Sequence, residues 1–142
     1  MSKSGRYSAD RKKIEAVDAA KTVEVAECGT IFMVTDSGDA GYTITLPTAA
    51  NAGKGWWCKF VVASAALAGD ATDDVVIANG DGNSSMAINY TDDGDTVGDA
   101  AANNIAFDHT CTRGDWIECW TDGSFWYAYA VSSAAAGILK DQ

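Results

Sequence analysis

The stretch from residue 116 to residue 130, WIECWTDGSFWYAYA, decides the fold class of this chain. Asp122 and Gly123 separate two runs of alternating bulky side chains, and Asp-Gly between such runs is a strong signal of a β-hairpin. A two-residue turn would place Thr121 opposite Ser124. The register then predicts three pairs on one side of the hairpin, which are Trp120 with Phe125, Glu118 with Tyr127, and Trp116 with Tyr129.

Both faces of this predicted hairpin carry apolar side chains, because the opposite side pairs Cys119 with Trp126 and Ile117 with Ala128. One side must face the core of the domain. The second side is then covered by another segment or by a partner outside the chain. We expect a contact between subunits rather than a platform for sugar rings, since an isolated sugar site seldom requires so many rings. The candidate contact residues are Trp116, Trp120, Phe125, Tyr127 and Tyr129.

Short strands and turns account for most of the remaining chain. Alternating apolar residues predict strands near residues 22–25, 31–34, 42–46, 56–62, 75–78, 86–90 and 105–111. Residues 91–103 are acidic with almost no apolar bulk, which predicts a surface loop. The pattern favours an all-β fold, an antiparallel, jelly-roll-like β-sandwich over residues 22–142.

Charge is distributed unevenly along the 142 residues, a length typical of one domain. Residues 1–21 carry a net charge of +3, and the other 121 residues carry −13, which together give the formal charge of −10. The acidic part, residues 22–142, repels phosphate backbones and anionic lipids. We therefore expect no binding to nucleic acid or to a membrane.

The basic segment 1–21 lacks a wide apolar stripe and predicts a flexible N-terminal arm that a partner could order. Its candidate contact residues are Arg11, Lys12, Lys13, Ile14 and Val17. No run approaches the roughly 18 apolar residues of a membrane helix, and the polar start lacks the apolar stretch of a secretory signal. We therefore expect synthesis in the cytoplasm.

Catalytic and metal-binding residues are few. His109 and Cys111 would lie two residues apart on one strand face, but no orienting group accompanies them, so the chain is not expected to be an enzyme. Calcium could bind the loop of Asp92, Asp93 and Asp95, although its spacing lacks the closing glutamate of an EF-hand, so we expect no cofactor. Arg113-Gly114-Asp115 is expected to be a turn. The four cysteines, which include no CxxC pair, are expected to be free and buried: Cys28, Cys58, Cys111 and Cys119.

Four segments in order resemble small bacteriophage virion proteins, above all head decoration (cement) proteins and related fibre-head domains. They are ECGTIF at 27–32, YTITLP at 42–47, NAGKG at 51–55 and DGSFWY at 122–127. The resemblance covers about residues 28–131 and consists of strand and turn chemistry, with no catalytic residue. The cysteine and tryptophan content of this chain has no counterpart in the pattern.

This resemblance implies a β-rich virion subunit, commonly a homotrimer, that sits on the outer surface of the capsid over junctions of the major capsid protein. An extended basic arm fits such a role. A receptor- or glycan-binding head domain of a phage fibre is the alternative, in which Trp116, Trp120 and Tyr129 would stack on sugar rings.

Overall fold

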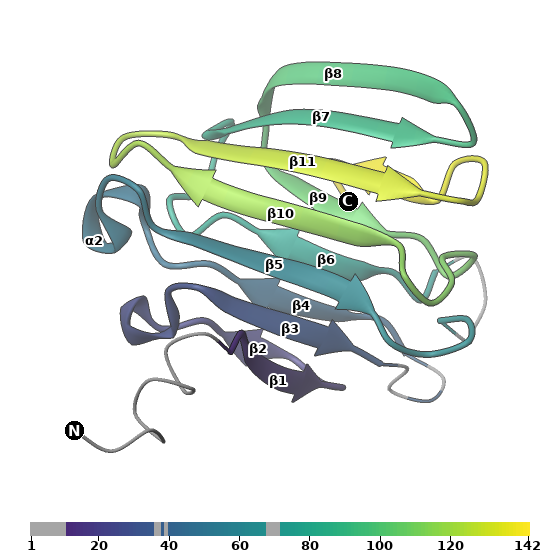
Figure 1. Ribbon diagram of the computed structural model, residues 1–142. Coiled ribbons are helices and arrows are strands. Elements are labelled where there is room, and N and C mark those ends of the chain that lie inside the picture. The colour runs from purple at the N-terminus through teal and green to yellow at the C-terminus, as the bar shows by residue number, and fades with distance from the viewer. Residues whose placement is uncertain (1–10, 36–37, 39, 68–71) are drawn as a thin grey trace.

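Two β-sheets packed face to face form the protein (Figure 1). The computed structural model describes residues 11–35, 38, 40–67 and 72–142. The expectation of an all-β sandwich is confirmed. Among the described residues, two short helices lie in connections between strands, the 3-10 helix η1 (Val25–Glu27) and α2 (Ala49–Ala52). Thr48 caps α2 by accepting a hydrogen bond from the Asn51 N–H.

The larger sheet has seven strands and lies toward the viewer in Figure 1. In spatial order they are β1 (Lys13–Val17), β3 (Thr30–Val34), β5 (Trp57–Val62), β10 (Trp116–Thr121), β11 (Trp126–Ser132), β7 (Met86–Asp92) and β8 (Asp95–Ala102). The second sheet lies behind it, in the order β12 (Ile138–Lys140), β9 (Asn104–Phe107), β6 (Val75–Ala78), β4 (Tyr42–Thr45) and β2 (Lys21–Thr22).

From β1 to β6 the chain crosses between the sheets at every strand. As a result β1, β3 and β5 are parallel neighbours in one sheet, and β2, β4 and β6 are parallel neighbours in the other. We call β1 to β6 with their connections the N-terminal crossover region. Parallel neighbours need a crossover connection, and here a strand of the opposite sheet supplies it.

From β7 onward the described strands pair mainly through antiparallel neighbours, with β11 and β7 as a parallel exception. The expectation of antiparallel pairing throughout, as in a jelly roll, is therefore wrong, and both sheets are mixed. Side-chain alternation has the same period in both kinds of pairing, so it carries no information on strand direction.

The core lies between the two sheets and consists of the inward half of each strand. Trp126, Phe60 and Phe107 are completely buried there. The rings of Phe32 and Phe60 stack with centroids 5.2 Å apart, and Trp56 meets Trp126 edge to face at 5.6 Å. The indole N–H of Trp56 donates to the Val25 carbonyl at 2.8 Å, which satisfies its polar atom inside the sandwich.

The expectation of a flexible arm up to residue 21 is wrong for Lys13–Val17. These residues form β1, which pairs in parallel with β3, and Val17 is buried in the core, so Val17 is not a contact residue for a partner. Lys21 ties this edge together, because its ammonium lies 3.0 Å from Glu15 and 2.8 Å from Glu27. Residues 1–10 of the expected arm lie outside the described residues.

The acidic segment expected to be a loop is a hairpin. Strand β7 extends to Asp92 and β8 begins at Asp95, with Asp93 and Gly94 at positive φ angles of 43° and 89° in the turn between them. Asp and Gly tolerate this conformation, which matches the twist of two-residue hairpins. Strand β8 is a sheet edge, where small and acidic side chains are tolerated because half of its surface needs no packing.

Candidate functional site

The outer face of the seven-stranded sheet carries most of the aromatic rings that do not enter the core. We call the outward side chains of its three central strands β5, β10 and β11 the outer aromatic face: Trp57, Lys59, Val61, Trp116, Glu118, Trp120, Tyr127, Tyr129 and Val131. Two of these rings are markedly exposed, Trp120 at 43% and Tyr129 at 47%. Apolar side chains of β3, Ile31 and Met33, extend the surface toward the sheet edge.

The rings of the outer aromatic face are arranged in cross-strand contacts. Trp120 stacks on Tyr127 with ring centroids 4.4 Å apart and planes at 14°, and Trp116 meets Tyr129 at 5.6 Å. Tyr127 is also fixed by its hydroxyl, which donates to the Asp122 carboxylate at 3.0 Å. These contacts fix the positions of the rings relative to one another, so the face is preorganised.

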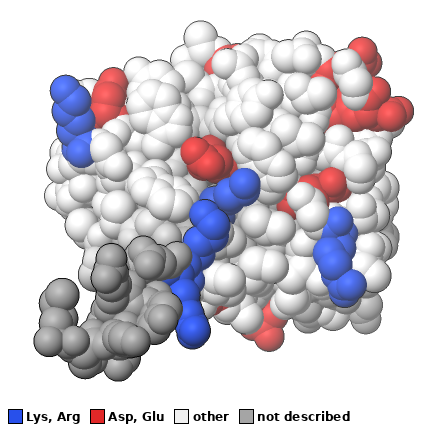
Figure 2. All heavy atoms as spheres, viewed as in Figure 1, with Lys and Arg blue, Asp and Glu red and all other residues white. Residues whose placement is uncertain are grey.

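Charge is sparse on this face. Its two charged members, Lys59 and Glu118, are direct neighbours on paired strands and cancel each other. The Lys59 ammonium lies 4.1 Å from the centre of the Trp116 ring, which is a cation–π contact. Figure 2, which views the same side as Figure 1, shows large white areas on this side, with a red group near the centre and a blue stripe that runs from there to the lower edge. This face thus differs from the chain as a whole, whose formal charge is −10.

The predicted pairing of the terminal hairpin is wrong by one step of two residues. Trp120 pairs with Tyr127, Glu118 with Tyr129, and Thr121 with Trp126. The loop is longer than a two-residue turn because the Asp122 carboxylate accepts hydrogen bonds from the N–H groups of Ser124 and Phe125. A shift of two residues leaves each side chain on its expected face.

The structure brings four of the five predicted hairpin residues together on the outer aromatic face, and Phe125 lies at its margin, 6.0 Å from the Tyr127 ring. Ile14 is 65% exposed on the neighbouring edge strand, where it pairs with Ile31. Arg11, Lys12 and Lys13 are also exposed beside that edge. Trp57 was not predicted, although its alternation with Lys59 placed it on the same face.

His109 and Cys111 do not form a catalytic pair. Strand β9 ends at Phe107, before the expected end at residue 111, and His109 lies in the following turn with its Nδ1 3.1 Å from an Asp108 oxygen. The Cys111 thiol donates instead to the Gly137 carbonyl at 2.8 Å. Burial raises the pKa of Cys111 to about 12, so this thiol stays protonated and is a poor nucleophile.

All four cysteines are free, and Cys58, Cys111 and Cys119 are buried as expected, whereas Cys28 is half-buried. Cys58 and Cys119 are directly paired across β5 and β10 in the core. Burial raises the pKa of both thiols, which therefore act as small apolar side chains.

The structure also shows where the Arg113-Gly114-Asp115 tripeptide and the aspartates of residues 92–95 lie. The expected turn at Arg113-Gly114-Asp115 is present, and Asp115 is buried beneath it, where its carboxylate accepts from Ser132 Oγ and from the N–H of Ser133. Arg113 donates to the Ala63 carbonyl at 2.8 Å. Asp92, Asp93 and Asp95 do not converge as a group of ligands among the described residues.

A second polar cluster lies at one end of the five-stranded sheet. Asp74 precedes β6, and Asp108 and His109 follow β9, whose Phe107 pairs with Val75. Their ligand atoms all lie within 4.8 Å of one another. Burial, with a smaller contribution from Asp108, raises the pKa of Asp74. Burial has the same effect on Asp108, but hydrogen bonds from the Thr110 hydroxyl and N–H and the proximity of His109 outweigh it and lower the Asp108 pKa.

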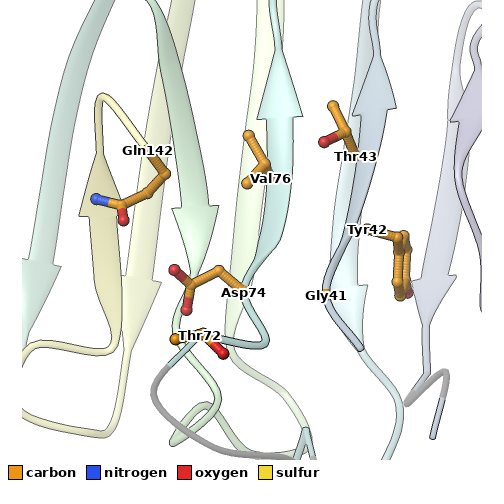
Figure 3. A pocket seen from close by; sticks show the side chains of 7 residues that line it. All are labelled: Gly41, Tyr42, Thr43, Thr72, Asp74, Val76 and Gln142. Carbon is orange, nitrogen blue, oxygen red and sulfur yellow. The ribbon is translucent and has the colours of Figure 1, made fainter. Parts of the chain in front are cut away.

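Asp74 also lines an open pocket of about 470 Å³ on the outer side of the five-stranded sheet. Figure 3 shows Asp74 there with Thr43 and Val76 of adjacent strands and with Gln142 from the C-terminal end of the chain. Polar and apolar groups share the lining.

Comparison of the chain with protein-family models, curated proteins and solved structures finds no match. Among the described residues, no helix has the length and apolar character to cross a membrane.

Proposed function

We propose that this protein is a non-catalytic virion subunit, a decoration protein that binds the outer surface of a phage head and stabilises the shell. The outer aromatic face carries this proposal. It offers apolar rings that are exposed, preorganised and free of net charge, while the same strands bury a complete core on their other side. Exposed contiguous apolar surface of this kind is typical of protein interfaces.

The composition of the face favours a protein partner. Aromatic residues are enriched and charged residues depleted at the centres of protein interfaces, as they are here. We propose two such partners, other copies of the chain in a homotrimer and the major capsid protein. Repeated identical contacts on a shell raise the strength of attachment beyond that of a single contact. The sequence resemblance to head decoration proteins supports the same assignment.

Cosedimentation with phage heads tests the proposal. Heads of the parent phage, stripped of this protein, would be mixed with the wild-type chain, with the double variant Trp120→Ala/Tyr129→Ala, and with Val25→Ala. Val25 is a matched control, because it is an apolar side chain, 44% exposed on η1, that is not a member of the outer aromatic face. Removal of two central interface rings should weaken head binding by about tenfold or more, and the control should bind as the wild type does.

Sedimentation velocity on the free protein completes the experiment. A trimer that binds heads, and whose head binding depends on Trp120 and Tyr129, agrees with the proposal. A monomer at high concentration that does not bind heads overturns it.

The fibre-head alternative rests on the exposure of Trp120 and Tyr129, since exposed rings can stack on sugars. A glycan array distinguishes it from head binding. Selective glycan binding that is lost in the double variant, without binding to heads, would replace the decoration role by receptor recognition.

A further inference from the structure

Asp74, Asp108 and His109 lie in a part of the molecule that the outer aromatic face does not use. We propose that these three side chains form a binding site for one divalent transition-metal cation, of the class that includes Mn²⁺ and Zn²⁺. The cation would join the end of β9 to the start of β6 at one end of the five-stranded sheet. This inference is independent of the proposed attachment to heads.

The arrangement of the ligand atoms supports the site. His109 Nδ1 and Asp108 Oδ1 are 3.1 Å apart. Bonds from nitrogen and oxygen ligands to such cations are about 2.0–2.2 Å long, so adjacent ligands of one ion lie about 2.8–3.6 Å apart. These two atoms therefore already have the separation of two ligands on one cation. The Asp74 carboxylate completes the group within 4.8 Å and needs only a small movement to reach the ion.

The state of the Asp74 carboxylate is a second, separate observation. Its Oδ1 is buried and has no hydrogen-bond partner among the described residues. A buried carboxylate oxygen without a donor is costly, and buried polar groups in folded proteins are nearly always satisfied. In Figure 3 the Asp74 side chain extends into the space beside the neighbouring strand, where Asp108 and His109 follow β9. A cation at this position would satisfy the oxygen.

The surroundings hold the other carboxylate in a suitable orientation. Asp108 Oδ2 accepts hydrogen bonds from the Thr110 N–H and hydroxyl, which leaves Oδ1 directed toward His109. Such outer partners commonly orient metal ligands. The side chains of Asp108 and His109 keep 14% and 28% of their exposure, so an ion can enter from solvent.

The donor set indicates the class of cation. Imidazole suits Zn²⁺ and its first-row neighbours, carboxylates suit harder ions such as Mn²⁺, and a mixed set selects the range between them. Ca²⁺ prefers six to eight oxygen ligands and is disfavoured by one imidazole among three ligands. Binding at Nδ1 requires that this nitrogen carry no proton, so the ring N–H would lie on Nε2 when the cation is bound.

Isothermal titration of the chelator-treated full chain with Zn²⁺ and with Mn²⁺ tests the site. The background carries Cys28→Ser, because Cys28 is the one cysteine that is not fully buried and a thiolate there could bind Zn²⁺ on its own. We expect one ion per chain, with affinity reduced tenfold or more in both Asp74→Asn and His109→Gln. The matched control is Asp93→Asn/Asp95→Asn, which removes two exposed carboxylates elsewhere and should leave the affinity unchanged.

Thermal unfolding provides a second readout that does not depend on heat of binding. At 100 times the dissociation constant, the metal should raise Tm by about 5–10 °C in the background protein and in the control, but not in the two site variants. Absence of binding at millimolar metal, or equal affinity in Asp74→Asn and the background, would overturn the site. If Asp74→Asn does not fold, the His109→Gln result alone decides.

Discussion

The two faces of the seven-stranded sheet are formed by the same strands but differ in how far their side chains are buried. On the inner face, Phe60 and Trp126 are completely buried against the second sheet. On the outer face, Trp120 and Tyr129 keep nearly half of their surface in solvent. Burial of apolar area stabilises the fold, so the inner rings account for stability. The outer rings contribute less to it, and the proposed contact with a partner would account for their presence.

The largest expected effect is the loss of stability when one ring of the inner face is removed. Phe60→Ala removes a side chain that is fully buried and stacked on Phe32, so it leaves a cavity and should lower the free energy of unfolding by about 3–5 kcal/mol. Denaturant unfolding measures the change, with Phe60→Leu as the conservative control at a smaller cost. A loss below about 1 kcal/mol would show that the inner face is not the stabilising one.

A smaller effect is expected at the paired thiols of the inner face. Cys119→Ser places a hydroxyl beside Cys58 in an apolar environment and should cost about 1–3 kcal/mol. Cys119→Ala, which lacks the hydroxyl, should cost less, and the difference between the two variants isolates the polar contribution. If the Cys119→Ser variant were as stable as Cys119→Ala, the serine hydroxyl would have to be solvated, and water would have to reach the contact between β5 and β10.

On the outer face, stability should respond much less. Trp120→Ala removes a stacking contact with Tyr127 from a position 43% exposed, so the free energy of unfolding should fall by no more than about 1.5 kcal/mol. The same unfolding experiment measures it. A loss comparable to that of Phe60→Ala would make Trp120 part of the core and would remove the contrast between the faces.

The smallest effect is a change in titration. The hydrogen bond to Asp122 raises the pKa of Tyr127. The pKa of Asp122 is lowered, mainly by hydrogen bonds from the backbone N–H groups of Ser124 and Phe125 and also by the bond from Tyr127. The contribution of Tyr127 to stability is therefore present below about pH 10 and disappears as pH rises through its raised pKa. That of Asp122 is present above about pH 3.8 and disappears as pH falls through its lowered pKa.

Ultraviolet titration of tyrosine ionisation measures this pair. Asp122→Asn keeps an acceptor for the turn but removes the negative charge, so one tyrosine should ionise at lower pH than in the wild type. Asp95→Asn, in the other hairpin, is the control and should leave the titration curve unchanged. An identical curve for Asp122→Asn would mean that the carboxylate does not hold Tyr127 on the outer aromatic face.

Alternation in the sequence predicted the positions and faces of most central strands, because burial on one side repeats every second residue. It also placed Trp116, Trp120, Tyr127 and Tyr129 on one face. The register was wrong because Asp122 caps a longer loop through its side chain. Strand β8 was missed because an edge strand of small and acidic residues has no apolar alternation.

Other features depend on contacts that sequence patterns do not contain. Strand β1 belongs to the sheet through backbone pairing with β3, and only Val17 among its residues is buried. Asp74 and Asp108 are brought together only because β6 and β9 are neighbours in the second sheet. No local signal near either residue indicates the other, since the pairing of distant strands determines their proximity.

The N-terminal crossover region has a consequence for the order in which the parts of the chain fold. Each parallel pair in it joins residues far apart in sequence, as when Tyr42 pairs with Val75, so a long loop must close before any contact compensates. The terminal hairpin closes a loop of only a few residues. We therefore expect β10 and β11 to associate early and to serve as the template on which β5, and then β3 and β1, are laid down. During synthesis, the half of the chain that leaves the ribosome first would be the half that completes its structure last.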